Sequence, residues 1–158
     1  IHDRARIRVE TESALHRALE TDQLSLEYQP ILHAGSGELL AVEALPRWNH
    51  PQFSQVSVEE LLRMAENSGL ALELGERIQT RALADWARMR EHLCPGTRLA
   101  LHLSARQLAH SGFVDDMLGR LDDHGLDGSA IEIELTEGAL MNDPELSQQV
   151  LTELSACG

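Results

Sequence analysis

The sequence has 158 residues, which is the length of one domain with a sizeable core. It carries 26 acidic residues against 13 basic ones, and the net charge of -13 argues against double-stranded nucleic acid or an anionic membrane as the main partner. All 13 basic residues are arginines, so a small anionic ligand needs a metal ion or a local arginine to offset the repulsion.

A helix and a hairpin open the chain. Apolar residues at helical spacing predict a helix that starts near residue 5 and ends near Thr21 and Asp22. The stretch 24–32 has the composition of a strand. Turn residues Gly35 and Gly37 then lead into a second strand over 38–48. We therefore expect these two strands to pair through a short hairpin-like connection.

Two helices follow the hairpin. Helical periodicity predicts the first over 58–69, with Ser57 as its N-cap and Gly69 at its end. The second is expected over 73–93 and stops before Pro95.

The rest of the chain alternates strands and helices. We expect strands over 97–104 and 130–137, with a helix over 113–125 between them. Asp143 is an N-cap residue and Pro144 suits the first helical position, so they mark the start of a last helix. This alternation implies an α/β fold with a largely parallel sheet covered by helices, and four strands are too few for a closed barrel.

Cysteine usage and hydropathy indicate the cellular setting. Cys94 and Cys157 lack metal-site spacing to any histidine, so reduced thiols in the cytoplasm are expected. No apolar stretch approaches the roughly 20 residues that cross a bilayer, and the first residues do not form a signal peptide. We expect a cytoplasmic protein with no membrane contact from this segment.

Polar side chains gather on one face of the predicted sheet. Alternation along the second strand puts Glu43, Leu45 and Arg47 on the same side. The third and fourth strands add His102 and Glu134 to a corresponding face. Buried carboxylates need protons, hydrogen bonds or a cation, and magnesium or manganese would serve. Alternatively, the glutamates lie on a solvated face or pair with arginines.

Four motifs occur in order along the chain: "YQPI", "EALPRW" followed by "NHP", "LSARQL" and "IEIELTE". Together they resemble the EAL family of cyclic di-GMP phosphodiesterase domains, over a region from about Glu10 to Gly158. The resemblance implies a TIM-barrel-like (β/α)8 fold whose first strand is antiparallel. It also implies hydrolysis of cyclic di-GMP to linear pGpG with Mg²⁺ or Mn²⁺.

The family's catalytic acids fall on three glutamates of this chain. Glu43 matches the metal-binding glutamate of the Glu-Ala-Leu motif, and Glu134 the metal-binding glutamate of the Glu-Leu-Thr-Glu motif. Glu137 matches the second acid of that motif, which is linked to an ordering loop. The resemblance therefore implies catalytic roles for all three.

The ligand-binding positions of the family are also present. Gln29 matches the glutamine beside the ligand, and Leu45 matches the leucine that packs near a base. Arg47 matches the arginine that meets a ligand phosphate. Cyclic di-GMP is thus the implied partner, in place of a nucleic-acid polymer.

One position departs from the family pattern. Where the family has "VNLS", with asparagine as a metal ligand, this chain has "LHLS", so His102 would join Glu43 and Glu134 at the metal. Imidazole binds manganese or zinc but is softer than the oxygen ligands that magnesium prefers. Alternatively, His102 is satisfied inside the barrel without touching metal.

The chain ends at "LSACG", before the Asp-Asp-Phe-Gly-Thr-Gly strand of the family. We expect residues 1–22 to be a linker helix from an upstream domain, often GGDEF in this family, and 23–158 to be the N-terminal half of an EAL domain. The remaining half would supply further acids and a catalytic lysine. The isolated segment is therefore expected to be inactive. It should form a homodimer, either by pairing through its uncovered strand edges or by exchanging segments, unless the missing half is present but unobserved.

Two functions fit these residues. The first is a metal-dependent phosphodiesterase, favoured by Glu43, Glu134, Glu137 and Arg47. The second is a catalytically degenerate cyclic di-GMP receptor or regulatory module, favoured by His102. The missing half would distinguish them.

Overall fold

The computed structural model describes residues 2–21, 23–53, 56–135 and 137–158, with the backbone alone at 2–8, 137, 138 and 142. Its helices and strands follow in chain order as α1 (His2–Glu20), β1 (Leu24–Leu32), β2 (Leu39–Trp48), α2 (Val58–Ser68), α3 (Ala71–Met89), β3 (Arg98–Leu103), α4 (Ala105–Leu108), α5 (Phe113–Asp123), β4 (Ile131–Leu135), α6 (Glu137–Asn142) and α7 (Pro144–Ala156). Short 3₁₀ turns cover Arg90–His92 and Gly128–Ala130.

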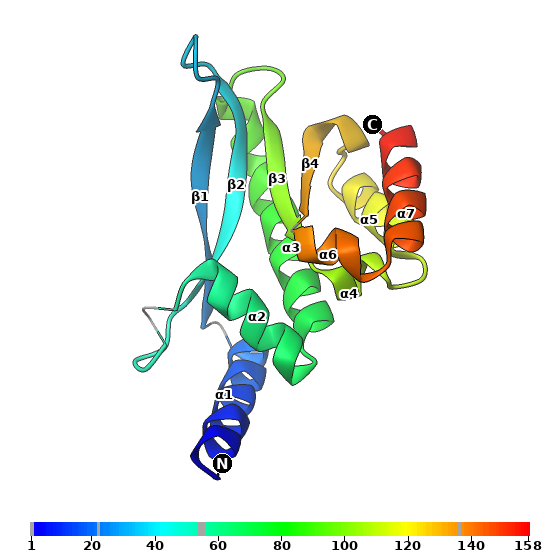
Figure 1. Ribbon diagram of the computed structural model, residues 1–158. Helices are drawn as coiled ribbons and strands as arrows, with labels where there is room; N and C mark the ends of the chain where they lie inside the picture. The colour runs from blue at the N-terminus through cyan, green and yellow to red at the C-terminus, as the bar shows by residue number, and fades with distance from the viewer. Residues whose placement is uncertain (1, 22, 54–55, 136) are drawn as a thin grey trace.

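The four strands form one sheet in the order β1-β2-β3-β4. β1 is antiparallel to β2, whereas β2, β3 and β4 are mutually parallel along the sheet, as expected. The carboxyl ends of the parallel strands therefore meet at one end of the sheet, where α2 also lies (Figure 1). In parallel α/β folds this end carries the functional groups.

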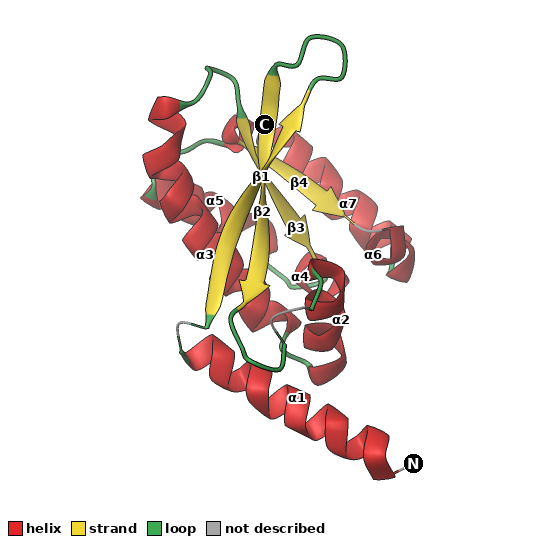
Figure 2. Cartoon of the chain, turned by 90° about the vertical axis from the view of Figure 1, so that its left-hand side faces the viewer, coloured by secondary structure: helices red, strands yellow, loops and turns green. Residues whose placement is uncertain are grey.

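Helices α3, α5 and α7 cover one face of the sheet and leave the opposite face free of them, as the two views show (Figure 1, Figure 2). Trp86 of α3 is the largest fully buried side chain and is 1% exposed. It packs with apolar residues from the sheet, α3, α5 and α7: Val42, Ala44, Leu99, Leu101, Leu103, Ala82, Leu83, Phe113, Met117, Leu121 and Val150. The helix-covered face is thus the apolar core, and the polar residues of each strand point the other way.

A smaller apolar cluster joins α1 and α2 to the end of β2. Trp48 is buried there and stacks on Phe53, with ring centroids 4.4 Å apart. Leu15 of α1 and Leu61 of α2 are buried in the same cluster. This packing holds α2 beside the carboxyl end of the sheet.

Helix ends follow the expected capping residues. The Ser57 hydroxyl accepts a hydrogen bond from the Glu60 backbone N–H at 3.2 Å, and Gly69 ends α2 with a φ of 78°. Asp143 caps α7, and Pro144 occupies its first position. None of the described helices is both long and apolar enough to cross a bilayer.

The short helices α4 and α6 were not expected from the sequence. In α4, Ser104 and Gln107 form a capping box, with the Ser104 backbone N–H donating to Gln107 Oε1 at 3.1 Å. A helix of four residues has too little length for an apolar repeat to show. α6 begins at Glu137, which the sequence pattern had placed at the end of the fourth strand, so that strand is shorter than expected.

Close packing between α3 and α4 gives a first prediction. A methyl group on Gly75 would meet the Gln107 side chain at 2.1 Å. Gln107 is buried and held by the capping box, so it cannot swing away freely. We expect Gly75→Ala to lower the free energy of unfolding by about 1–3 kcal/mol, as measured by chemical denaturation.

Gly119 of α5 is the matched control for this substitution. A methyl group there would meet no described atom within 4 Å. Gly119→Ala is therefore expected to be neutral or to stabilise the protein by up to about 1 kcal/mol. Equal losses of stability in the two variants would contradict the packing argument.

Candidate functional site

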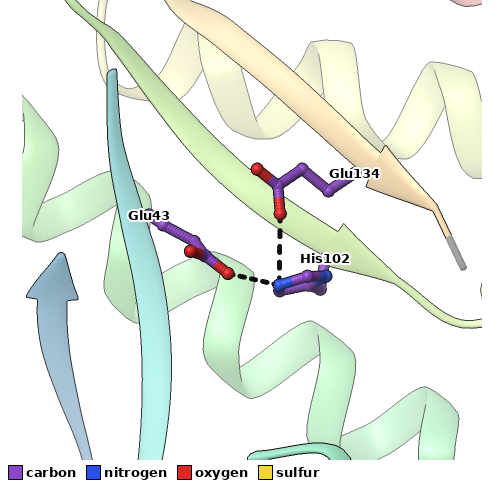
Figure 3. A group of neighbouring side chains, drawn as sticks. All are labelled: Glu43, His102 and Glu134. Carbon is purple, nitrogen blue, oxygen red and sulfur yellow. Dashed lines mark hydrogen bonds and ion pairs between the residues drawn. The ribbon is translucent and has the colours of Figure 1, made fainter. Parts of the chain in front are cut away.

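Three neighbouring parallel strands each contribute one side chain to a cluster of two glutamates and a histidine on the face that is free of α3, α5 and α7. Glu43 comes from β2, His102 from β3 and Glu134 from β4 (Figure 3). His102 and Glu134 are directly paired in the strand register, whereas Glu43 is paired with Ala100. The alternation of side chains along each strand explains why all three point to the same side.

The His102 imidazole lies between the two carboxylates. Its Nε2 atom is 2.5 Å from Glu43 Oε1 and 3.2 Å from Glu134 Oε2. Nε2 carries at most one proton, so it donates fully to only one carboxylate at a time. The three side chains are between 19% and 29% exposed, which leaves the group open to a ligand.

The surroundings of Glu134 disfavour its negative charge. Burial raises the pKa of this carboxyl above its ordinary value, and the nearby charge of Glu43 raises it further. His102 acts in the opposite direction and favours the ionised form. A positive charge placed between the two carboxylates would therefore stabilise their ionised forms.

The alternative in which Glu43 and Glu134 pair with arginines is not seen among the described ion pairs, and such a pair forms instead at the neighbouring Glu132. Its carboxylate lies 3.0 Å from Arg98 Nη2. Glu43 and Glu134 instead contact His102. Only the latter pair is thus arranged as candidate metal ligands.

The three side chains fit a metal ion. One ligand atom from each of Glu43, His102 and Glu134 lies within 4.8 Å of the other two. Ligand atoms at right angles around an octahedral ion with bonds of about 2.1 Å are roughly 3 Å apart. His102 Nε2 lies 2.5 Å and 3.2 Å from the two carboxylates, which is near this value, and the three side chains are therefore placed so that they could share a divalent cation.

A cavity of about 600 Å³ adjoins this group. Its lining includes Glu43 and His102 together with the expected ligand-binding residues Gln29, Leu45 and Arg47. The volume is in the ordinary range for a small-molecule site. Another cavity of about 480 Å³ lies beside β1 and α3, but its lining contains none of the three candidate metal ligands.

Arg47, which lines the cavity, already has an anionic partner. Its Nε donates to Glu27 Oε2 at 2.8 Å, from one strand of the hairpin to the other. The Glu27 side chain is 65% exposed, and exposed ion pairs contribute little to stability. A phosphate could therefore take the place of Glu27 at small cost.

Sequence reasoning missed Glu27 and a charged face of α2. Glu59, Arg63 and Glu66 line the cavity opposite the strands. Hydrogen bonds from its own backbone N–H and from Ser57 lower the pKa of the Glu59 carboxyl, so it stays ionised beside the cavity. The spacing of these three residues along one helix face was the signal that could have found them.

Glu137 is the one expected site residue that cannot be placed. Its backbone starts α6 directly after β4, but its side chain lies outside the described residues. Its catalytic role therefore stays a prediction.

The family model for the EAL domain matches residues 12–158. The chain belongs to the EAL domain family. MucR of Pseudomonas aeruginosa, named as a bifunctional diguanylate cyclase and cyclic di-GMP phosphodiesterase, is 38% identical over 144 residues, which are 91% of this chain and 21% of MucR. NbdA of the same organism, named as a cyclic di-GMP phosphodiesterase, is 34% identical and is matched over 98% of this chain and 20% of its own length.

A solved EAL structure supports the same assignment. The structure described as the PaMucR phosphodiesterase in complex with c-di-GMP has a TM-score of 0.85 and 36% identity, covering 94% of this chain and 60% of that one. The TIM-barrel-like EAL fold is thus confirmed, with only part of the domain in this chain. The chain spans about a fifth of the length of the curated relatives described above.

Proposed function

We propose that this EAL domain takes part in the metal-dependent hydrolysis of cyclic di-GMP to linear pGpG in second-messenger signalling. The observation that carries the proposal is the ligand group of Glu43, His102 and Glu134 at the edge of a cavity that also contains Arg47. The named activities of MucR and NbdA support it. The activity itself would belong to the natural full-length protein.

Each residue has a role in this proposal. Glu43, His102 and Glu134 would hold Mg²⁺ or Mn²⁺, and the bound ion would supply polarisation of a phosphate oxygen and a lower pKa for a water molecule. Arg47 exchanges Glu27 for a phosphate of the dinucleotide and offsets the negative charge of the chain. Leu45 packs against a guanine base, and Gln29 lies beside it on β1. Glu137, whose backbone starts α6, keeps the catalytic role that the family motif implies.

Product analysis tests the proposed reaction. The natural full-length protein is incubated with cyclic di-GMP and Mn²⁺, and the nucleotides are separated by chromatography. Accumulation of linear pGpG is the expected result. Binding without cleavage would favour the receptor function, which the contact of His102 with both carboxylates makes the second candidate.

Arg47 gives a second prediction. Arg47→Ala should weaken cyclic di-GMP binding by about 1.5–3 kcal/mol, because a charge-assisted hydrogen bond to phosphate is lost. Calorimetry in metal-free buffer measures this change without cleavage of the ligand.

Two further variants sharpen the Arg47 experiment. Glu27→Gln removes the competing carboxylate and should leave the affinity unchanged or increase it by up to about 1 kcal/mol. Arg81→Ala removes an arginine of α3 that pairs with Asp85, away from the cavity lining, and should not affect binding. A folded Arg47→Ala variant with unchanged affinity would rule out the assignment.

The proposal also includes a cellular location and an oligomeric state. Cys94 and Cys157 are both free thiols, which agrees with a cytoplasmic location. In the 158-residue segment taken by itself, β1 and β4 each pair on one side only within the described sheet, and such edges favour association of two copies of the segment. Light scattering on the isolated segment measures whether it forms this homodimer, and a monomer at all concentrations would exclude it.

A further inference from the structure

We propose that His102 makes the metal site selective for a transition-metal ion, in the order Zn²⁺ and Co²⁺ above Mn²⁺, and all three above Mg²⁺. This inference rests on the metal site of the proposed function but concerns which ion the site retains. It starts from the donor atoms, which are two carboxylate oxygens and one imidazole nitrogen.

The geometry assigns the nitrogen a central position among these donors. His102 Nε2 is the atom that faces both carboxylates, at 2.5 Å from Glu43 and 3.2 Å from Glu134. When the ring proton is on Nδ1, the Nε2 lone pair points to the region that the two carboxylates also face. A cation shared by Glu43 and Glu134 therefore meets the imidazole directly.

The chemistry of the donor atoms determines the expected order of affinity among the ions. Mg²⁺ prefers oxygen ligands and keeps several of its waters, so an imidazole in its first coordination sphere offers it little. Imidazole suits zinc and the later transition metals better than manganese, and the affinities of such sites follow the Irving–Williams order, in which manganese lies below cobalt and zinc. Both carboxylates attract every divalent cation, so the nitrogen is the donor that separates the ions.

Net charge does not explain the selectivity. Histidine in its neutral form carries the same charge as asparagine, the residue at this position in the family pattern. The substitution His102→Asn therefore changes the donor atom and its reach while leaving the charge of the site at that of two carboxylates. The variant isolates donor chemistry from electrostatic attraction.

Metal titrations of the metal-free natural protein test the inference without any activity measurement. They are made by calorimetry at one pH above the ordinary histidine pKa of about 6.5. We expect Zn²⁺ and Co²⁺ to bind at least roughly 100-fold more tightly than Mg²⁺. His102→Asn should lose at least roughly tenfold in Zn²⁺ and Co²⁺ affinity, since even outer-shell partners contribute that much. Its Mg²⁺ affinity should stay the same or rise.

Two controls separate the possible failures. His110→Asn removes an exposed histidine beside Asp116 and should leave every metal affinity unchanged. Glu43→Gln should lower the affinity of the site for all the metal ions. If Glu43→Gln changes no affinity, the metal site of the proposed function fails. If Glu43→Gln lowers the affinity for all ions but His102→Asn leaves the order of their affinities unchanged, only the selectivity inference is overturned.

A spectroscopic measurement on the unmodified protein covers the case in which His102→Asn does not fold. Electron spin-echo modulation of the Mn²⁺-loaded protein detects nitrogen coordinated to the ion. Modulation from an imidazole nitrogen is the expected result. A spectrum with oxygen ligands alone would overturn the inference.

Discussion

Exchanging Glu43 for glutamine in the natural full-length protein is expected to reduce cyclic di-GMP hydrolysis by roughly 100-fold or more. Glutamine keeps the shape of the side chain but loses the negative charge that offsets a divalent cation. Removing residues that only orient metal ligands already lowers metal affinity or activity by about 10–100-fold. Removing a ligand itself should lower the activity by at least as much. The rate is measured by chromatography of the nucleotides at saturating metal.

Glu132→Gln is the matched control for this experiment. Glu132 lies on β4 two residues before Glu134, but it pairs with Arg98 and is outside the ligand group. The same chemical change there should alter the rate by less than about threefold, because exposed ion pairs contribute little. A folded Glu43→Gln protein with full activity would remove Glu43 from the metal site.

Trp86→Ala is expected to cause the largest loss of stability. The side chain is 1% exposed and joins α3 to the sheet, α5 and α7. Truncating a buried tryptophan removes apolar contacts and leaves a cavity, at a cost of about 3–5 kcal/mol. Chemical denaturation of the natural protein measures the loss.

Leu72→Ala tests whether that loss comes from burial. Leu72 is on the same helix but is 37% exposed. Its truncation should change the free energy of unfolding by no more than about 0.5 kcal/mol, as is usual for surface positions. Comparable losses at both positions would contradict the assignment of the Trp86 loss to burial, since alanine has the higher helix propensity in both cases.

Much of the fold could be predicted because local chemistry determines it. The strands β1 and β2 lie within a residue of their expected bounds, since Gly35 and Gly37 separate two strand-like segments. Ser57 and Asp143 mark helix starts because their side chains cap free backbone N–H groups. The helix α4 escaped prediction, because four residues carry no visible repeat.

The candidate site was predictable in its composition but not in its contacts. Alternation along the strands was enough to put Glu43, His102 and Glu134 on one face. It could not show that His102 bridges the two carboxylates, because that depends on the register between strands and on rotamers. The pairing of Arg47 with Glu27 was missed for the same reason, since it forms between two strands of a hairpin.

Anomalous diffraction from crystals of the natural protein with Mn²⁺ and cyclic di-GMP tests the central claim most directly. The account predicts a manganese peak coordinated by Glu43, His102 and Glu134, with a phosphate of the dinucleotide next to it and Arg47 turned from Glu27 to that ligand. A dinucleotide bound away from this cavity, or a manganese peak elsewhere with His102 still held between the two glutamates, would contradict it.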